Sequence, residues 1–328
     1  MINKSEVKKI LVISLSNIGD VILTFPVMDI LKAEFPQAKL SVVIGPKAET
    51  LLMANPLLDK VYLYDKRQKI WKILEWIWKL RRENFDLVVD LRNTAIPLLL
   101  GARYRTSVFA ASAEHGHMKD KHILRLKTLL PGAQPTKMRF ALYLSDESKD
   151  YIQKVIKSYM NQLSKYIVIC PGAADSNKRW GAQGFKKLAD CLIEIFDTRI
   201  FFAGDESDWN FVNQLMQHMK HAGVNLCGMT TLSQLASLIE GACLVITNDS
   251  APLHLASYLN KPVVALFGPT DPRLFGPWSE KSHSIRRNEN CPACQHLKGF
   301  PHNCMKNITW EEVFELIQTE FREVLAYP

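Results

Sequence analysis

The chain has 328 residues, of which 47% are hydrophobic and 23% charged, a composition typical of a soluble globular protein with a sizeable core. This length favours two domains over one, and no stretch approaches the ~20 uninterrupted apolar residues of a membrane-spanning helix. Seven scattered cysteines without a secretory signal are typical of free thiols in a reducing compartment. We therefore expect a cytoplasmic protein.

The net charge of +8 comes from the first half of the chain, because residues 1–160 are strongly basic and the remainder is close to neutral. Such asymmetry predicts an anionic partner or a membrane surface for the first half. The alternative is a lysine-rich surface that only aids solubility, and charge by itself leaves both open.

Apolar runs and amphipathic stretches alternate through the first half, which predicts a doubly wound α/β sheet. The loop SNIGD places Asp20 at the carboxyl end of the first strand, and it lacks the GxGxxG pattern of dinucleotide-binding loops. Asp20 there serves either as a helix cap or as a general base. Strands are expected at 9–15, 40–44, 61–63, 87–91 and 106–110, and helices at 21–35, 70–83 and 146–163.

The helix expected at 70–83 has two interpretations. Trp71, Leu74, Ile77 and Trp78 lie on one face with lysines and arginines around them, as in helices that rest on membranes or grip lipid. An apolar stripe is also what any helix covering a sheet requires. We favour the second interpretation, a helix packed on its own sheet.

A second cycle of alternating elements begins at residue 166. Strands are expected at 166–170, 199–203, 244–247 and 263–267, with a short one at 226. Helices are expected at 185–196, 208–222, 232–240, 253–259 and 310–327. The two halves predict two Rossmann-like doubly wound domains facing a central cleft, at 1–163 and 164–309, followed by a C-terminal helix at 310–328.

The polar turn at 248–252 joins a buried strand to a short helix at the carboxyl edge of the second sheet. Such a turn directs free backbone amides and the positive end of a helix at one place, where α/β proteins hold phosphate. Ser250 and His254 are four residues apart and so can share one helix face. The alternative is that Asp249 or Ser250 only caps a structural helix.

Two further loops are expected at the same edge of the second sheet. Lys178 and Arg179 could neutralise a diphosphate leaving group without a metal. The carboxylate of Glu206 could accept hydrogen bonds from ribose hydroxyls, although a plain turn explains this segment equally well.

Four segments together resemble glycosyltransferase family 9, the ADP-heptose:lipopolysaccharide heptosyltransferases: SNIGDVILTFPVMDILK, PGAADSNKRW, the stretch from GMTT to GPTDP, and the segment near Cys291. The resemblance covers nearly the whole chain and implies a GT-B fold. It implies inverting, metal-independent transfer of heptose from ADP-heptose to the lipopolysaccharide inner core, with no cofactor. It further implies that Asp20 is the catalytic base, that Lys178 binds the donor phosphates and that Met229 contacts the nucleobase. The implied donor-binding turn comprises Asp249, Ser250, Ala251 and His254.

The chain departs from the family pattern at several positions. Ala173 and Ala174 replace hydroxyl residues of some members, Ala251 stands where glycine is usual, and the acidic segment around Glu206 is short. These departures concern the sugar nucleotide more than the fold. The alternatives are therefore another sugar nucleotide or a protein acceptor, a GT-B sugar-nucleotide epimerase, and a non-catalytic sugar-nucleotide-binding protein.

Arg92, Arg103 and Arg105 lie near strand ends of the first domain and are candidate contacts for an acceptor carboxylate or phosphate. The expected partners are a sugar nucleotide and a lipid-linked anionic saccharide. We expect no nucleic acid. The expected location is the cytoplasm of a Gram-negative bacterium, peripheral to the inner membrane.

Cys291, Cys294, His302 and Cys304 have partial zinc-ligand character, with one CxxC pair and no second tidy pair. They either bind a structural metal or are free thiols in a loop. We favour the thiols and predict no metal for the transfer reaction.

Overall fold

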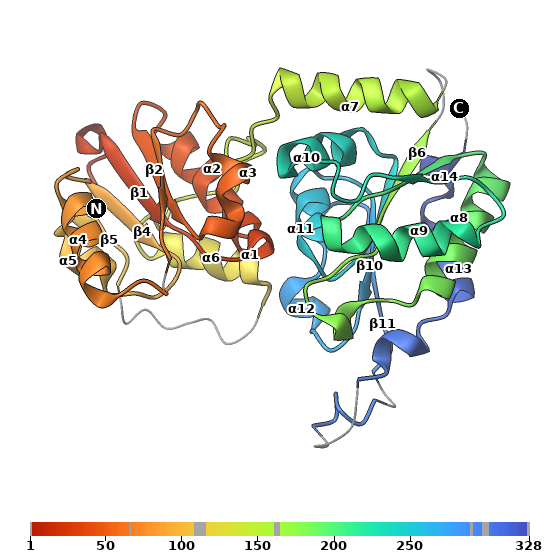
Figure 1. Ribbon diagram of the computed structural model, residues 1–328. Coiled ribbons are helices and arrows are strands. Elements are labelled where there is room, and N and C mark those ends of the chain that lie inside the picture. The colour runs from red at the N-terminus through yellow and green to blue at the C-terminus, as the bar shows by residue number, and fades with distance from the viewer. Residues whose placement is uncertain are drawn as a thin grey trace. The chain divides into compact units, whose positions relative to one another are not determined.

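The computed structural model describes residues 2–65, 67–107, 116–160, 165–288, 291–296 and 302–326. The chain divides into two compact units, Met1–Tyr143 and Leu144–Pro328, each built around one parallel sheet with helices packed on it (Figure 1). The predicted architecture of two doubly wound α/β domains is confirmed. Every helix within the described part of the chain is too short or too polar to cross a bilayer.

The first unit has a five-stranded sheet in the order β3-β2-β1-β4-β5. Leu11 and Ile13 of the central strand pack beneath two helices that cover one face of the sheet, and Val43 and Val88 of the neighbouring strands join them. Ile10 and Val12, which point to the opposite face, are also buried, and burial on both faces explains why this strand is a continuous apolar run. The strands are Lys9–Ile13 (β1), Lys39–Ile44 (β2), Lys60–Leu63 (β3), Leu87–Asp90 (β4) and Tyr104–Arg105 (β5). The helices are Ile18–Ile22 (α1), Phe25–Glu34 (α2), Glu49–Leu52 (α3), Ile70–Arg81 (α4), Ile96–Leu100 (α5) and Met118–Lys127 (α6).

Two elements of the first unit differ from their predictions. The helix expected at 21–35 is two helices, α1 and α2, because the chain turns at Thr24 and Pro26 occupies the first turn of the second helix. The strand expected at 106–110 is instead the two-residue β5 just before that range, and Thr106 and Ser107 are not part of it. Residues 108–110 of that prediction lie outside the described residues.

The second unit has a six-stranded sheet in the order β11-β10-β9-β6-β7-β8. Ile167 and Ile169 of β6 alternate with residues of the opposite face, and they join one apolar core with α8, α9 and α13. The strands are Tyr166–Cys170 (β6), Arg199–Phe202 (β7), Val224–Asn225 (β8), Leu244–Asn248 (β9), Val263–Phe267 (β10) and Ser282–Arg286 (β11). The helices are Asp146–Tyr159 (α7), Ala182–Phe196 (α8), Trp209–Gln217 (α9), Leu232–Gly241 (α10), Ala251–Tyr258 (α11), Pro272–Phe275 (α12), Trp310–Glu320 (α13) and Arg322–Leu325 (α14); 3-10 turns lie at Ser176–Lys178 (η3), Glu206–Asp208 (η4) and Cys304–Asn307 (η5).

The division between the units differs from the predicted boundary after residue 163. Helix α7 packs along α10, and Tyr151 Oη donates to the carbonyl of Met229 at 3.2 Å, so α7 belongs to the second unit (Figure 1). The C-terminal helix predicted as a separate element also packs into this unit, where α13 contacts α8. The division therefore falls between Tyr143 and Leu144, at the start of α7.

Candidate functional site

In each unit the winding of the sheet reverses between two adjacent strands. The reversal lies between β1 and β4 in the first unit and between β6 and β9 in the second. Open α/β sheets bind ligands in the crevice outside the carboxyl ends of such strands. Asp20 and Arg92 follow β1 and β4, and Lys178 and Asp249 follow β6 and β9. Both sets of predicted residues therefore lie at the switch point of their own sheet.

An ion pair occupies the switch point of the second unit. Lys178 Nζ lies 2.6 Å from Asp249 Oδ2, and the Asp249 side chain is only 5% exposed. Lys178 remains 28% exposed, so its amine is fixed by the carboxylate and still reaches the surface. Asp249 thus orients the predicted phosphate-binding cation.

Asn248, the last residue of β9, ties this strand to the loop that follows β6. Its Nδ2 donates to the carbonyl of Pro171 at 2.6 Å, and its Oδ1 accepts from the backbone amide of Trp180 at 3.3 Å. Sequence reasoning missed this role. The available signal was an amide at the end of a fully buried apolar strand, because a buried polar side chain requires partners.

The first turn of α11 has no side-chain cap among the described residues; Pro252 carries no amide hydrogen, and the amide of Leu253 donates to the carbonyl of Ser250 at 3.1 Å. Ser250 holds the N-cap position with extended backbone, but among the described residues its hydroxyl contacts Thr247 Oγ1 and the carbonyl of Asn248 at 3.3 Å each, and caps no helix amide. The predicted side-chain cap by Ser250 or Asp249 is therefore not formed. Ala251 adds no bulk, so the positive end of the helix is accessible to an anion.

His254 lies in the middle of α11 and is 5% exposed. Its ring stacks on Trp278, with centroids 5.7 Å apart and planes 23° from parallel. This packing holds α11 against the loop after α12. The prediction placed Ser250 and His254 on one helix face that looks into the crevice. The observed position of His254 differs, since this side chain is buried.

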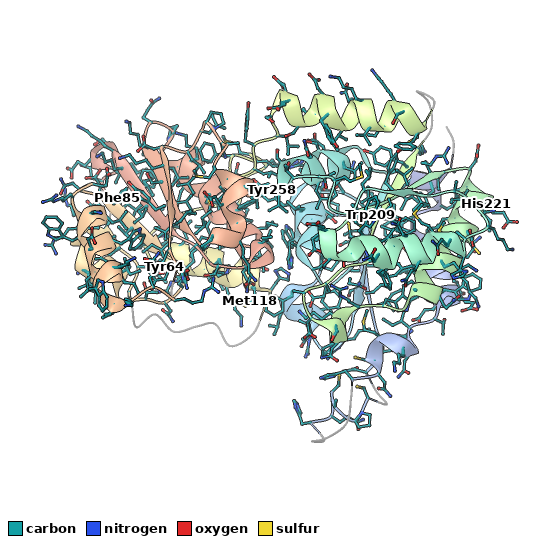
Figure 2. The ribbon with its side chains drawn as sticks, in the orientation of Figure 1. Tyr64, Phe85, Met118, Trp209, His221 and Tyr258 are labelled. Atoms are coloured by element: carbon teal, nitrogen blue, oxygen red, sulfur yellow. The ribbon has the colours of Figure 1, made fainter. Side chains whose placement is uncertain are left out.

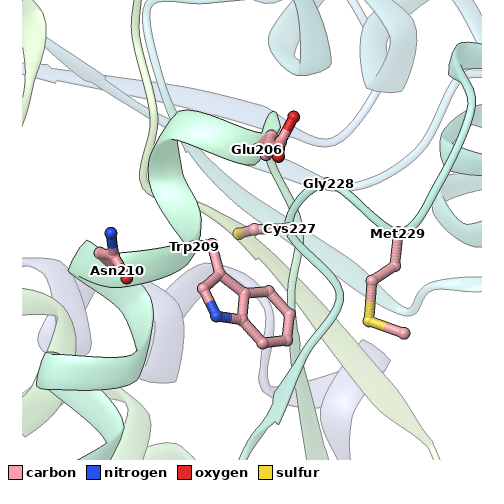
Figure 3. A pocket seen from close by; sticks show the side chains of 6 residues that line it. All are labelled: Glu206, Trp209, Asn210, Cys227, Gly228 and Met229. Atoms are coloured by element: carbon pink, nitrogen blue, oxygen red, sulfur yellow. The ribbon is translucent and has the colours of Figure 1, made fainter.

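Glu206 and Met229 line one open pocket of about 390 Å³ at the carboxyl ends of β7 and β8 (Figure 3). Met229 and Trp209 offer apolar surface there, being 49% and 38% exposed. Gly228 has φ +71°, and a Cβ atom at this position would lie 3.0 Å from Glu206 Cα, so the two loops approach closely. The structure brings the two predicted donor residues together. Sequence reasoning missed Trp209, whose signal was a tryptophan just after an acidic turn.

Asp208 and Arg179 join the loops after β6 and β7. Arg179 Nη1 lies 3.1 Å from Asp208 Oδ1, and Arg179 Nε donates to the carbonyl of Ala173 at 2.7 Å. A Cβ atom on Gly172 would lie 2.0 Å from Asp208 Oδ2, which explains the glycine. Burial, then the neighbouring Asp205, raises the pKa of Asp208, and Arg179 opposes that rise. This pair holds the two loops in register.

These features follow one another along the carboxyl edge of the second sheet. The pocket lies at β7 and β8, and the Lys178–Asp249 pair lies at the adjacent β6 and β9. Strands are about 4.8 Å apart, so the two places are roughly 10 Å apart along the edge. An elongated ligand with a flat apolar group at one end and an anionic group further along fits this arrangement.

At the switch point of the first unit, Asp20 lies in the first turn of α1. Its Oδ2 accepts a hydrogen bond from Asn17 Nδ2 at 2.9 Å, and its side chain is partly exposed. The loop before it is held closely, since a Cβ atom on Gly45 would lie 2.7 Å from Ser16 Cα. The carboxylate is therefore positioned by its backbone and is accessible to solvent.

The three predicted arginines lie in two places. Arg92 lies after β4 with its guanidinium 5.0 Å from the ring centroid of Tyr64, and its Nη1 is buried without a hydrogen-bond partner in the described part of the chain. Tyr64 is labelled in Figure 2. Arg103 and Arg105 instead flank Tyr104 at the edge strand β5, where they line a second open pocket of about 420 Å³. Arg103 pairs with Glu6, before β1, at the opposite edge of the sheet from Asp20.

Helix α4 exposes much of its apolar surface. Trp71, Leu74 and Trp78 are 58%, 55% and 54% exposed, whereas Ile77 and Leu80 pack on the sheet. The favoured interpretation, in which the whole stripe covers the sheet, is therefore wrong for the first three. We call the exposed set the α4 patch; it comprises Ile70, Trp71, Leu74 and Trp78.

Comparison with known proteins identifies relatives along most of the chain. The sequence model of glycosyltransferase family 9 (heptosyltransferase) matches residues 73–302. Lipopolysaccharide heptosyltransferase 3 of Escherichia coli (strain K12) is 28% identical over 291 residues, which span 80% of this chain and 83% of that protein.

Solved structures agree with this match. A family 9 glycosyl transferase from Veillonella parvula DSM 2008 has a TM-score of 0.80 at 23% identity, covering 96% of this chain and 97% of that one. The E. coli ADP-heptose lipopolysaccharide heptosyltransferase II has a TM-score of 0.75 at 25% identity, covering 97% of this chain and 98% of that one. The predicted GT-B class and family are confirmed, and the chain belongs to glycosyltransferase family 9.

Proposed function

We propose that this protein transfers heptose from ADP-heptose to a lipopolysaccharide inner-core acceptor, with inversion at the anomeric carbon and without a metal in the reaction. The observation that carries the proposal is the fixed cation Lys178 beside the uncapped first turn of α11, next to an apolar-lined pocket on the same sheet edge. The names of the relatives supply the sugar and the acceptor class.

The donor nucleotide is proposed to lie along the carboxyl edge of the second sheet. Its base contacts Met229 and Trp209, and its ribose hydroxyls donate to the carboxylate of Glu206. The diphosphate then reaches Lys178 and the amides at the start of α11. The Asp249 carboxylate prevents Lys178 from turning away, so the cation is in place before the leaving group develops charge.

The proposed reaction is a single displacement. Asp20 accepts the proton of the acceptor hydroxyl while the oxygen of that hydroxyl bonds to the anomeric carbon. The bond from that carbon to the diphosphate oxygen breaks, and ADP leaves with its electron pair. Lys178 and the dipole of α11 stabilise the added negative charge on ADP. The partly exposed Asp20 carboxylate supports this role, because it has a single amide partner among the described residues and can meet the acceptor.

Arg92 is proposed to bind a carboxylate or phosphate of the acceptor. Its buried Nη1 donor lacks a partner in the described residues, and a buried donor without a partner costs free energy. A hydrogen bond to an anionic oxygen of the acceptor would remove that cost. Arg103 and Arg105 would contact a more distant part of the same saccharide through their own pocket.

The α4 patch is proposed to rest on the anionic cytoplasmic surface of the inner membrane, where a lipid-linked acceptor lies. Tryptophans suit the membrane interface, and cations accompany them: Arg82 lies 3.4 Å from the Trp78 ring centroid and Lys69 lies 4.9 Å from that of Trp71. The basic first half of the chain adds long-range attraction to anionic lipid.

The test is calorimetric binding of ADP, ADP-heptose, UDP and GDP, followed by transfer to a Kdo–lipid A acceptor with NMR assignment of the new anomeric centre. Selective binding of the ADP compounds and an inverted product are expected. Preference for UDP or GDP would support another sugar nucleotide, and conversion of donor without acceptor would support an epimerase. Absence of any nucleotide binding would support a non-catalytic protein.

A further inference from the structure

Four metal-ligating side chains converge outside the proposed active site. The ligand atoms of Cys291, Cys294, His302 and Cys304 all lie within 4.8 Å of one another. Cys294 Sγ is 3.7 Å from Cys304 Sγ and 3.3 Å from His302 Nδ1, and Cys291 Sγ is 4.0 Å from the same nitrogen. Two short segments, 291–294 and 302–304, therefore direct three sulfurs and one imidazole at one point.

The two shortest separations, 3.3 and 3.7 Å, already match one tetrahedral ion, and the widest, up to 4.8 Å, need a contraction of about 1 Å. A tetrahedron with ligand bonds of about 2.0–2.3 Å has edges of roughly 3.3–3.8 Å, which is the spacing expected for three thiolates and one imidazole on zinc. A disulfide requires a sulfur separation of about 2.05 Å, well below that of Cys294 and Cys304. Simple packing of loop thiols gives no reason for a ring nitrogen to point at the same centre.

The surroundings are those of a closed structural site rather than an open catalytic one. The side chains of Cys291 and Cys304 are fully buried, and the backbone amide of Asn303 donates to Cys291 Sγ at 3.4 Å. Such amide donors orient and stabilise metal-bound thiolates. Soft thiolate ligands select zinc over magnesium or calcium, and four protein ligands leave no position for a substrate.

We propose that Cys291, Cys294, His302 and Cys304 bind one structural Zn²⁺ ion, which fixes η5 and through it braces the loop that carries Lys178. Binding releases the thiol protons to solvent, as thiolates are the ligands. The metal is separate from the transfer chemistry, for which no metal is proposed. The sequence favoured loop thiols, since it could not show that the two segments meet.

The link from the zinc site to the donor loop passes through η5. Cys304 begins this turn, and the next residue, Met305, lies in the core of the second unit. A Cβ atom on Gly268 would lie 3.0 Å from Met305 Cγ and 2.7 Å from the carbonyl of Asn177, so Gly268 packs between Met305 of η5 and the residue before Lys178. On the other side of Lys178, Trp180 Nε1 donates to the carbonyl of Ile308 at 2.9 Å.

The first experiment is elemental analysis of the purified full-length protein by mass spectrometry, followed by replacement of the ion with Co²⁺. One zinc per chain and visible absorption typical of tetrahedral cobalt thiolate are expected. A protein that contains no metal and takes up no cobalt would overturn the proposal. One equivalent of iron would overturn zinc as the ion.

Substitutions then assign the ligands. Cys294→Ser should lose the zinc, whereas His302→Cys should keep it, because four thiolates also form a tetrahedral zinc site. Cys191→Ser on α8, outside the cluster, is the matched control and should keep the full zinc content. Zinc retained in Cys294→Ser at the wild-type level would contradict the ligand assignment, and so would zinc lost from the control.

The bracing role rests on the proposed function of Lys178 and needs its own readout. Cys294→Ser should have a lower Tm and a several-fold higher Kd for ADP than Cys191→Ser. Unchanged ADP affinity after zinc loss would overturn the brace while leaving the site. If wild type holds zinc but binds no nucleotide, the proposed function fails and the zinc site stands. If wild type binds ADP but contains no zinc, the zinc site fails and the proposed function stands.

Discussion

The two switch points of the molecule are built with different degrees of constraint. In the second unit, Asp249 pairs with Lys178 and Asn248 bonds to both sides of the loop after β6, so the loops are joined across the strands. In the first unit, the Asp20 carboxylate has only the Asn17 amide as a partner among the described residues. A site that stabilises a developing charge benefits from fixed dipoles, whereas a general base must be free to meet the acceptor. This contrast agrees with a donor site in the second unit and a base in the first.

The largest expected effect is at the weakly constrained switch point. Asp20→Asn keeps the shape and removes the base, so kcat for transfer should fall by about 10²- to 10⁴-fold. Because the donor is proposed to bind the second unit, the calorimetric Kd for ADP should remain unchanged. Asp59→Asn, an exposed carboxylate of the same unit, should retain wild-type kcat. Full activity of Asp20→Asn would contradict the assignment of Asp20 as the general base.

The constrained switch point is tested by removing its ion pair. Lys178→Ala should weaken ADP binding by about 1.5–3 kcal/mol, or roughly 10- to 150-fold, since a charge-assisted contact is lost. It should also lower the free energy of unfolding, because the buried Asp249 carboxylate loses its partner.

A double-mutant cycle separates these two effects. Lys178→Ala with Asp249→Ala should recover unfolding free energy in denaturant titrations but not ADP affinity. Lys220→Ala, an exposed lysine of the same unit, is the matched control. Recovery of ADP affinity in the double variant would show that Lys178 only neutralises Asp249.

The sequence predicted both units and the strand ends that carry the site, because buried parallel strands and their following turns leave strong local patterns. It could not predict that Lys178 pairs with Asp249, since that contact depends on β9 lying beside β6. The two residues are 71 positions apart in the chain, and their adjacency is a property of strand order. Asn248 was missed for the same reason, as both of its partners lie in the loop after β6.

Helix α4 shows a different limit of sequence reasoning. Its apolar residues occupy two faces, with Ile77 and Leu80 inward and Trp71 and Trp78 outward. Periodicity identifies an apolar face but not which of two faces meets the sheet. Burial in the structure resolves this, and it makes the exposed tryptophans available to a partner.

The α4 patch offers a further test of the contrast between the two units, because the proposed membrane contact belongs to the first unit only. Trp71→Ser with Trp78→Ser should lower binding to anionic phospholipid vesicles about tenfold in a sedimentation assay. Transfer to a short water-soluble acceptor should be unaffected. Ile195→Ser, which removes an equally exposed apolar side chain from the second unit, should bind vesicles as wild type does. Equal losses of vesicle binding in both variants would contradict a specific role of the α4 patch in membrane binding.

The smallest expected effect is a pH dependence of the free energy of unfolding that arises in the first unit. Burial, then the nearby Arg125 and His117, lowers the pKa of His122 in α6 to about 4 from its usual 6.5. A histidine with a depressed pKa in the folded state contributes stability above pH 6.5, and this is lost as the pH falls from 6.5 towards 4. The free energy of unfolding should therefore drop by about 1 kcal/mol between pH 7.5 and 5.5 from this group.

Replacement of that side chain tests the assignment. His122→Leu should reduce the pH dependence by this amount in denaturant titrations, whereas His218→Leu, on an exposed turn of the second unit, should leave it as in wild type. If both variants keep the full pH dependence, the acid sensitivity arises from other groups. A reduction only in His122→Leu would locate it in the first unit, where the buried face of α6 holds a neutral imidazole that acid must charge.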